Sequence, residues 1–149
     1  MEVVIIPVLE DNFAYLLYDK TTLEGMVIDG VEPVKVLGVV ERFGVHVHCI
    51  ASTHHHWDHS GGNIELSARL GGIPVLGGEG DDVPGVSRPL VHREKFHVGS
   101  LEVQVLQTPC HTKGHVSYFA TDGSRRAVFT GDTLFVGKSV LIPSLNLVV

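Results

Sequence analysis

Apolar and polar residues alternate along much of this 149-residue chain, and the pattern predicts a protein dominated by short β-strands. Polar turns separate the apolar stretches, as at residues 10–12 and 19–22. In chain order, the predicted strands are residues 3–9, 13–18, 25–29, 46–52, 74–76, 96–98, 101–107, 116–120 and 127–130.

Two stretches follow the helical period instead. Residues 33–43 begin with Pro33, which suits the first turn of a helix, and are followed by Gly44, which suits a helix end. The second predicted helix covers residues 63–70. In the first helix the apolar residues recur at helical spacing, at Val36, Val39, Val40 and Phe43. Helices that alternate with some of the strands indicate the α/β class with a mixed sheet.

The composition indicates a single globular domain, with 44% hydrophobic and 19% charged residues. A net charge of −6 disfavours nucleic acid as a partner, because phosphate binding needs a basic face. Cys49 and Cys110 are too few for a disulfide framework. No stretch is long and apolar enough for a signal peptide or a membrane span, so we expect a cytoplasmic protein, with a mitochondrial form still open.

The segment Thr53-His54-His55-His56-Trp57-Asp58-His59 carries most of the chemical information. Three histidines and a carboxylate in the pattern H-x-H-x-D-H are ligands that suit divalent transition metals. On an extended segment His54 and His56 can point together, while Asp58 and His59 lie where the chain should turn. An expression tag would lie at a terminus, whereas this run follows an apolar strand. The segment therefore predicts two adjacent metal positions.

Two later segments could complete such a site, and each follows a predicted strand. His111 could join His54 and His56 and leave an open fourth position, as in catalytic zinc sites. Taken alone, it could equally be a surface or capping histidine. Asp132 could bridge two cations, although a Gly-Asp pair is also ordinary turn chemistry.

In order and spacing these residues resemble the metallo-β-lactamase superfamily. The amino-acid sequence around them resembles its glyoxalase II (hydroxyacylglutathione hydrolase) members. The segments that carry the resemblance are VLEDNFAYLLYD, THHHWDH, TPCHTKGH and FTGDTLFVG. The resemblance covers residues 1–137 and implies the αββα sandwich fold of that superfamily. From residue 138 to residue 149 the chain departs from the family pattern and reads as an apolar tail.

The resemblance also implies the role of each site residue. One metal would be bound by three histidines and the other by an aspartate and a histidine, with a second aspartate bridging both: His54, His56 and His111; Asp58 and His59; and Asp132. Asp58 and Asp132 are the implied catalytic residues. Zinc is the implied metal, with iron or manganese as alternatives. Residues around the ligands would be Thr53, Trp57, Cys110 and His115, with Cys110 as a small buried residue. His55 should point away from the metals.

The implied reaction is hydrolysis of an S-2-hydroxyacylglutathione, such as S-D-lactoylglutathione, to glutathione and a hydroxy acid such as D-lactate. In the family this reaction belongs to methylglyoxal detoxification and proceeds by attack of a metal-bound hydroxide. The expected partner is therefore a small-molecule glutathione thioester, with neither nucleic acid nor a membrane involved. We expect a monomer.

The departure after residue 137 limits what the resemblance implies. The family pattern continues into a last metal-binding histidine, the rest of the sandwich and a helical domain that contacts glutathione. Without these parts we expect an incomplete αββα sandwich with an exposed apolar sheet face, an incomplete second metal site and weakened substrate binding. The alternatives are a metal-binding remnant or isoform without turnover and, ranked lower, a persulfide dioxygenase with one iron.

Overall fold

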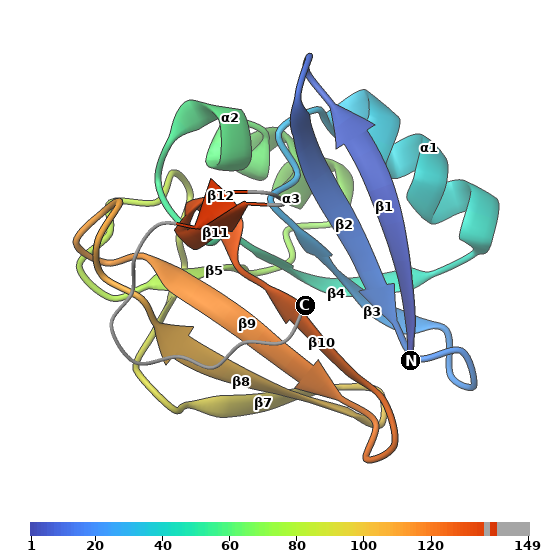
Figure 1. Ribbon diagram of the computed structural model, residues 1–149. Coiled ribbons are helices and arrows are strands. Elements are labelled where there is room, and N and C mark those ends of the chain that lie inside the picture. The colour runs from blue at the N-terminus through green and yellow to red at the C-terminus, as the bar shows by residue number, and fades with distance from the viewer. Residues whose placement is uncertain (136–137, 140–149) are drawn as a thin grey trace.

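Two β-sheets face each other in the computed structural model, which describes residues 1–135 and 138–139 (Figure 1). The strand order of the first sheet follows the sequence, β1-β2-β3-β4-β5-β6. Strands β1 to β3 are antiparallel, and β3 to β6 are parallel. The bounds are β1 (Glu2–Val8), β2 (Asn12–Tyr18), β3 (Glu24–Ile28), β4 (His46–Ala51), β5 (Val75–Gly78) and β6 (Arg88–Leu90).

The second sheet is an antiparallel meander with the strand order β10-β9-β8-β7. Along β8, Leu101, Val103 and Val105 are fully buried, whereas Glu102 and Gln104 between them are only half-buried. This alternation is the reason the segment forms a strand with one face in the core. The bounds are β7 (Lys95–Val98), β8 (Leu101–Gln107), β9 (Val116–Thr121) and β10 (Arg126–Phe129). A 3-10 turn, η1 (Gly131–Thr133), leads to β11 (Leu134–Phe135), which pairs with β12 (Lys138–Ser139).

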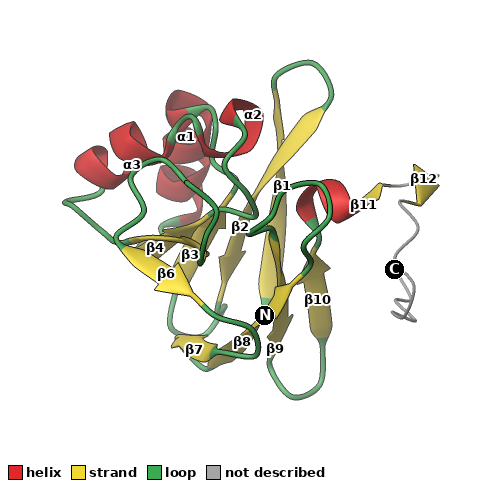
Figure 2. Cartoon of the chain, turned by 90° about the vertical axis from the view of Figure 1, so that its left-hand side faces the viewer, coloured by secondary structure: helices red, strands yellow, loops and turns green. Residues whose placement is uncertain are grey.

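The helices lie on one side of the first sheet (Figure 2). They are α1 (Pro33–Phe43), the one-turn helix α2 (Trp57–Ser60) and α3 (Asn63–Arg69). Helix α1 begins at Pro33 and ends before Gly44, whose φ of 63° is left-handed and whose N–H caps the last turn. Its apolar stripe faces the sheet, with Val36 and Val40 buried.

The hydrophobic core is therefore divided into two layers. One lies between the sheets and includes Leu17, Ile28, Leu76 and Tyr118. The other lies between the first sheet and the helices and includes Leu16, Ile50 and Leu66. The order helix, sheet, sheet agrees with the predicted metallo-β-lactamase-like α/β fold. In the described residues no helix lies on the outer face of the second sheet, so the fourth layer of the sandwich is missing there.

An apolar patch is exposed where β1 and β2 pair. Ile5 is 60% exposed and Phe13 46% exposed, and the cross-strand partner of Ile5 is Tyr15, which packs against the core between the sheets. Ile5 therefore lies on the sheet face that points toward the second sheet. This finding matches the exposed apolar sheet face that we expected for an incomplete sandwich.

The predicted elements agree with the observed ones except in short segments. Helix α1 has the predicted bounds, and strand ends differ from prediction by one or two residues. The four-residue helix α2 and the short strands β6, β11 and β12 were not predicted. Residues 136–137 and 140–149 lie outside the described residues, and most of the predicted apolar tail falls there. Among the described helices none is long and apolar enough to cross a membrane.

Candidate metal centre

The histidine-rich segment follows β4 at the carboxyl edge of the parallel part of the first sheet, a common position for ligand sites in α/β proteins. The predicted strand over residues 46–52 ends at Ala51, and residues 53–55 form a bend that leads into α2, in place of the extended segment that we expected for His54 and His56. Hydrogen bonds explain the bend. The Ser60 hydroxyl donates to the carbonyls of His55 and His56, at 2.8 Å and 2.9 Å, and the His59 N–H also donates to His56 O.

The bend nevertheless brings three predicted ligands together. His54 Nε2 lies 3.1 Å from His56 Nδ1, and His111 Nε2 lies 2.9 Å from the same His56 atom. Two nitrogens bound to one tetrahedral zinc at about 2.1 Å would be roughly 3.4 Å apart. The three imidazoles therefore fit a single divalent ion with small adjustments of their rings.

A second group of possible ligand atoms adjoins the first and consists of His54, His59 and Asp132. Asp132 contacts a histidine of each group, with Oδ1 3.0 Å from His59 Nε2 and Oδ2 3.2 Å from His111 Nε2. This position is what a bridging carboxylate requires. Asp58 is at the edge of the second group, where its Oδ2 lies 3.5 Å from His59 Nε2.

The two groups differ in charge. Burial and the nearby His59 lower the pKa of His54 to about 3, so this imidazole is neutral at pH 7 and has a lone pair available. Burial also lowers the pKa of His59, but the Asp132 and Asp29 carboxylates outweigh this effect and raise it to about 10. The pKa of Asp132 is lowered because its contacts with His59, His54 and His111 outweigh its burial.

Asp29 and Asn12 support the site and were not predicted to do so. Asp29 is buried at the end of β3 and accepts hydrogen bonds from the Thr53 N–H and hydroxyl, both at 2.8 Å. Its Oδ2 is also 3.0 Å from His59 Nδ1, which orients that ring. The Asn12 side chain donates to the Asp58 carbonyl and lies 3.2 Å from His59 Nε2.

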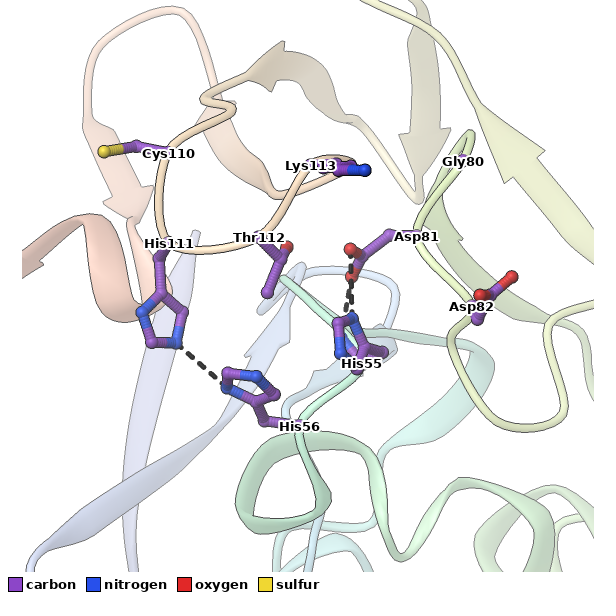
Figure 3. Close-up of a pocket in the computed structure, with 9 residues that line it drawn as sticks. All are labelled: His55, His56, Gly80, Asp81, Asp82, Cys110, His111, Thr112 and Lys113. Atoms are coloured by element: carbon purple, nitrogen blue, oxygen red, sulfur yellow. Dashed lines mark hydrogen bonds and ion pairs between the residues drawn. The ribbon is translucent and has the colours of Figure 1, made fainter.

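The residues beside the predicted ligands behave in different ways. His55 points away from the two groups, as expected, and its ring contacts Asp81 (Figure 3). His115 is fully buried and stacks on His54 with ring centroids 5.0 Å apart. The prediction that Cys110 is buried was wrong, because it is exposed on a turn closed by its own N–H and Thr112 O. Trp57 is 70% exposed and so does not pack against the site.

Among the residues that the structure describes, two cavities open onto the candidate ligands. One of about 330 Å³ is lined by His56 and His111 together with Thr112 and Lys113 (Figure 3). The other, of about 290 Å³, is lined by His59 and Asp132 together with apolar side chains that include Phe13, Tyr15 and Phe135. A small molecule could therefore approach the ligand groups from either side.

Facing sheets, a helical layer and a histidine and aspartate cluster at the sheet edge together define a class of metal-binding α/β proteins. The profile of the Metallo-beta-lactamase superfamily matches residues 13–147. The chain belongs to this superfamily.

Among curated relatives, the chain is 41% identical over 139 residues to the cytoplasmic hydroxyacylglutathione hydrolase of Arabidopsis thaliana, covering 91% of this chain and 54% of the relative. It is also 41% identical to a human hydroxyacylglutathione hydrolase-like protein, covering 91% and 48%. The chain thus spans about half the length of the curated relatives it matches. Among solved structures, ETHE1 from Myxococcus xanthus superposes with a TM-score of 0.76 at 30% identity, covering 91% of this chain and 59% of that one.

Proposed function

We propose that the chain is the metal-binding part of a thioester hydrolase that acts on S-2-hydroxyacylglutathione, with S-D-lactoylglutathione as the substrate to test first. The single observation that carries the proposal is the pair of adjoining ligand groups with Asp132 in contact with a histidine of each. The relatives named hydroxyacylglutathione hydrolase support the choice of substrate.

The proposed ligands divide the donor atoms between two ions. One ion would be held by three imidazoles and the other by a carboxylate and an imidazole, with a shared carboxylate: His54, His56 and His111; Asp58 and His59; and Asp132. Because imidazole and carboxylate donors are common zinc ligands, we propose zinc, with iron or manganese as alternatives. A divalent ion there would lower the pKa of a bound water to about 7 and polarise a thioester carbonyl.

The chain's own residues would prepare the ligands and handle protons. Asp29 holds His59 through Nδ1 and so directs its Nε2 toward Asp132. Asp132 would hold the two groups at a fixed separation, because it contacts a histidine of each. The Asp58 carboxylate is partly exposed, and we assign it the proton that water loses when it attacks the substrate. No strong general acid is needed, because a thiolate is a competent leaving group.

Metal content and thioester hydrolysis of the purified chain test the proposal together. After zinc loading, we expect bound metal and loss of the thioester absorbance of S-D-lactoylglutathione. His56→Ala should abolish hydrolysis, whereas His97→Ala, which changes an exposed histidine in β7, should leave it unchanged. In a preparation free of contaminating enzyme, activity that survived His56→Ala would refute the assignment.

Two alternatives follow from the same site. A metal-binding remnant or isoform would bind zinc without turnover. A persulfide dioxygenase with one iron is the lower alternative, and the likeness to the ETHE1 structure favours testing it. Oxygen consumption by the iron-loaded chain with glutathione persulfide would separate it from a hydrolase.

The remaining expectations also belong to this proposal. The Arabidopsis relative that is named cytoplasmic supports a cytoplasmic location. A small glutathione thioester is the proposed partner, and we propose that the chain acts as a monomer without nucleic acid. Size-exclusion chromatography with light scattering at several protein concentrations tests the oligomeric state.

A further inference from the structure

We infer that Asp81 is a positioning residue that joins the loop carrying His54 and His56 to the loop carrying His111, and thereby tightens the three-histidine group around one metal ion. The inference rests on the proposed metal site and adds to it a carboxylate that is not itself a ligand.

Asp81 lies in the turn that follows β5, and its side chain is only 2% exposed. One carboxylate oxygen, Oδ2, accepts the backbone N–H of His55 at 2.7 Å. The other, Oδ1, lies 3.1 Å from His55 Nδ1 (Figure 3). The same oxygen accepts the backbone N–H of Gly114 at 3.3 Å. One buried carboxylate thus contacts the backbone of both ligand-bearing loops.

The packing around this carboxylate is close. A Cβ added at Gly114 would overlap the backbone and the Cβ of Asp81, and one added at Gly78 would overlap the Gly114 carbonyl. The turn after β5 therefore lies directly against the loop that carries His111. Burial raises the pKa of Asp81, but the nearby Thr112 hydroxyl and the contacts with His55 outweigh it, so the group is a carboxylate at neutral pH.

Two attachment points are needed to fix one loop against another. The first is the hydrogen bond from the Val116 N–H to Thr53 O, at 2.9 Å, which holds the loops together where they leave their strands. With this bond alone the loops could still rotate against each other. Asp81 supplies the second attachment, because it holds His55 and Gly114, which are one and three residues away from ligands.

His111 is the ligand that most needs such support. In the described part of the chain, the polar contacts of its ring are with His56 and Asp132, which are themselves proposed ligands. Its side chain is 34% exposed. The separation of His111 from His56 is consequently set by the backbone of the loop, and Asp81 holds that backbone at Gly114.

The test compares Asp81→Asn with Asp82→Asn. The amide at position 81 retains one acceptor oxygen and the shape of the side chain, but its NH₂ group cannot accept the second backbone N–H. Asp82 is the next residue and is exposed, so its change removes an equal charge at nearly the same place. Zinc affinity of each folded protein is measured by competition with a chromophoric chelator.

We expect Asp81→Asn to weaken binding of the first zinc equivalent by about 10- to 100-fold, the usual effect of losing a group that orients metal ligands, and Asp82→Asn to stay within about twofold. Amide hydrogen exchange of the metal-free proteins gives a second readout that needs no metal. Exchange at His55 and Gly114 should be faster in Asp81→Asn than in the parent and in Asp82→Asn.

The outcomes separate this inference from the proposed function. Parent-like zinc affinity in Asp81→Asn overturns the positioning role, as does equal loss of affinity in both variants, which would indicate a charge effect alone. If the parent binds no zinc, the proposed function fails. Exchange then decides the role of Asp81, since faster exchange at both amides supports it and unchanged exchange overturns it.

Discussion

Replacing Asp29 by asparagine tests how the site is built. The carboxylate is buried and accepts two hydrogen bonds from Thr53, one from its N–H and one from its hydroxyl, and its Oδ2 lies 3.0 Å from His59 Nδ1. An amide oxygen can still accept the Thr53 N–H. The amide NH₂ would face the Nδ1–H of His59, so two donors would meet in a buried place.

The size of the effect follows from these contacts. A hydrogen bond to a charged group contributes about 1.5–3 kcal/mol, and a buried donor left without an acceptor costs about 1–3 kcal/mol. Asp29→Asn should therefore lower the free energy of unfolding of the metal-free protein by roughly 3 kcal/mol. Because small domains are stable by about 5–15 kcal/mol, this variant should still fold. Asp29→Ala removes every acceptor and should cost more.

Urea unfolding of the proteins, made metal-free with a chelator and followed by circular dichroism, measures this change in the free energy of unfolding. Asp11→Asn changes an exposed carboxylate and is the matched control, with an expected change within about 0.5 kcal/mol. An Asp29→Asn protein as stable as this control would refute the reasoning, because it would mean that the buried carboxylate adds nothing over an amide. A large loss of stability in both variants would point to net charge instead.

Three further predictions concern protonation and exposure. Burial raises the pKa of Cys49 to about 12, whereas Cys110 is exposed, so a thiol reagent at neutral pH should label Cys110 alone. Cys110→Ser should abolish that labelling, and labelling of both cysteines in the folded protein would contradict the structure. Burial lowers the pKa of His59, but Asp132 and Asp29 outweigh it and raise the pKa to about 10, so the ring holds a proton at pH 7 that a metal would have to displace. The affinity for the second metal, measured by calorimetric titration, should therefore rise about tenfold per pH unit up to that pKa. An affinity that does not change with pH would contradict this. The Ser100 hydroxyl and N–H hold the pKa of Asp19 well below its usual range, so this carboxylate stabilises the fold above its unfolded pKa of about 3.9, and this stability is lost as the pH falls further. Asp19→Asn should therefore lower the free energy of unfolding most near neutral pH and less in acid. A loss of free energy that is the same at every pH would show that the charge is not involved.

The parts of the fold that were predictable are those whose signal is local and repeated. Helix α1 shows its buried stripe at Val36 and Val40 and has Pro33 and Gly44 at its ends, so both period and boundaries were readable. Strand β6 has three residues with Pro89 in the middle, and a proline argues against a strand unless the strand lies at a sheet edge, as β6 does. The edge position of β6 depends on its pairing with β5, so the sequence of β6 alone could not predict it.

In the candidate site, too, some residues have a local sequence signal and others depend on which segments the fold brings together. His54 to His59 are contiguous, so their chemistry could be predicted from spacing alone. Asp29 and Asp81 carry no such signal, because an aspartate after a strand or in a turn is ordinary. Their roles depend on which segments the sheets bring together: β3 beside β4 for Asp29, and the turn after β5 beside the loop that follows β8 for Asp81. The exposure of Cys110 likewise depends on the turn geometry of that loop.

The two ligand groups are therefore unequal for a reason that lies in the described residues themselves. In the first group His54 is neutral at pH 7, and the Nε2 atoms of His54 and His111 lie 3.1 Å and 2.9 Å from His56 Nδ1, close to the distance between two ligands of one zinc ion. In the second group His59 must release a proton, and Asp58 stays at the edge, 3.5 Å from that ring. Because proton release and side-chain movement both oppose binding, the three-histidine group should take up metal first. Asp132, which already contacts His111, would then help to hold both ions, and this would lower the cost of completing the second position.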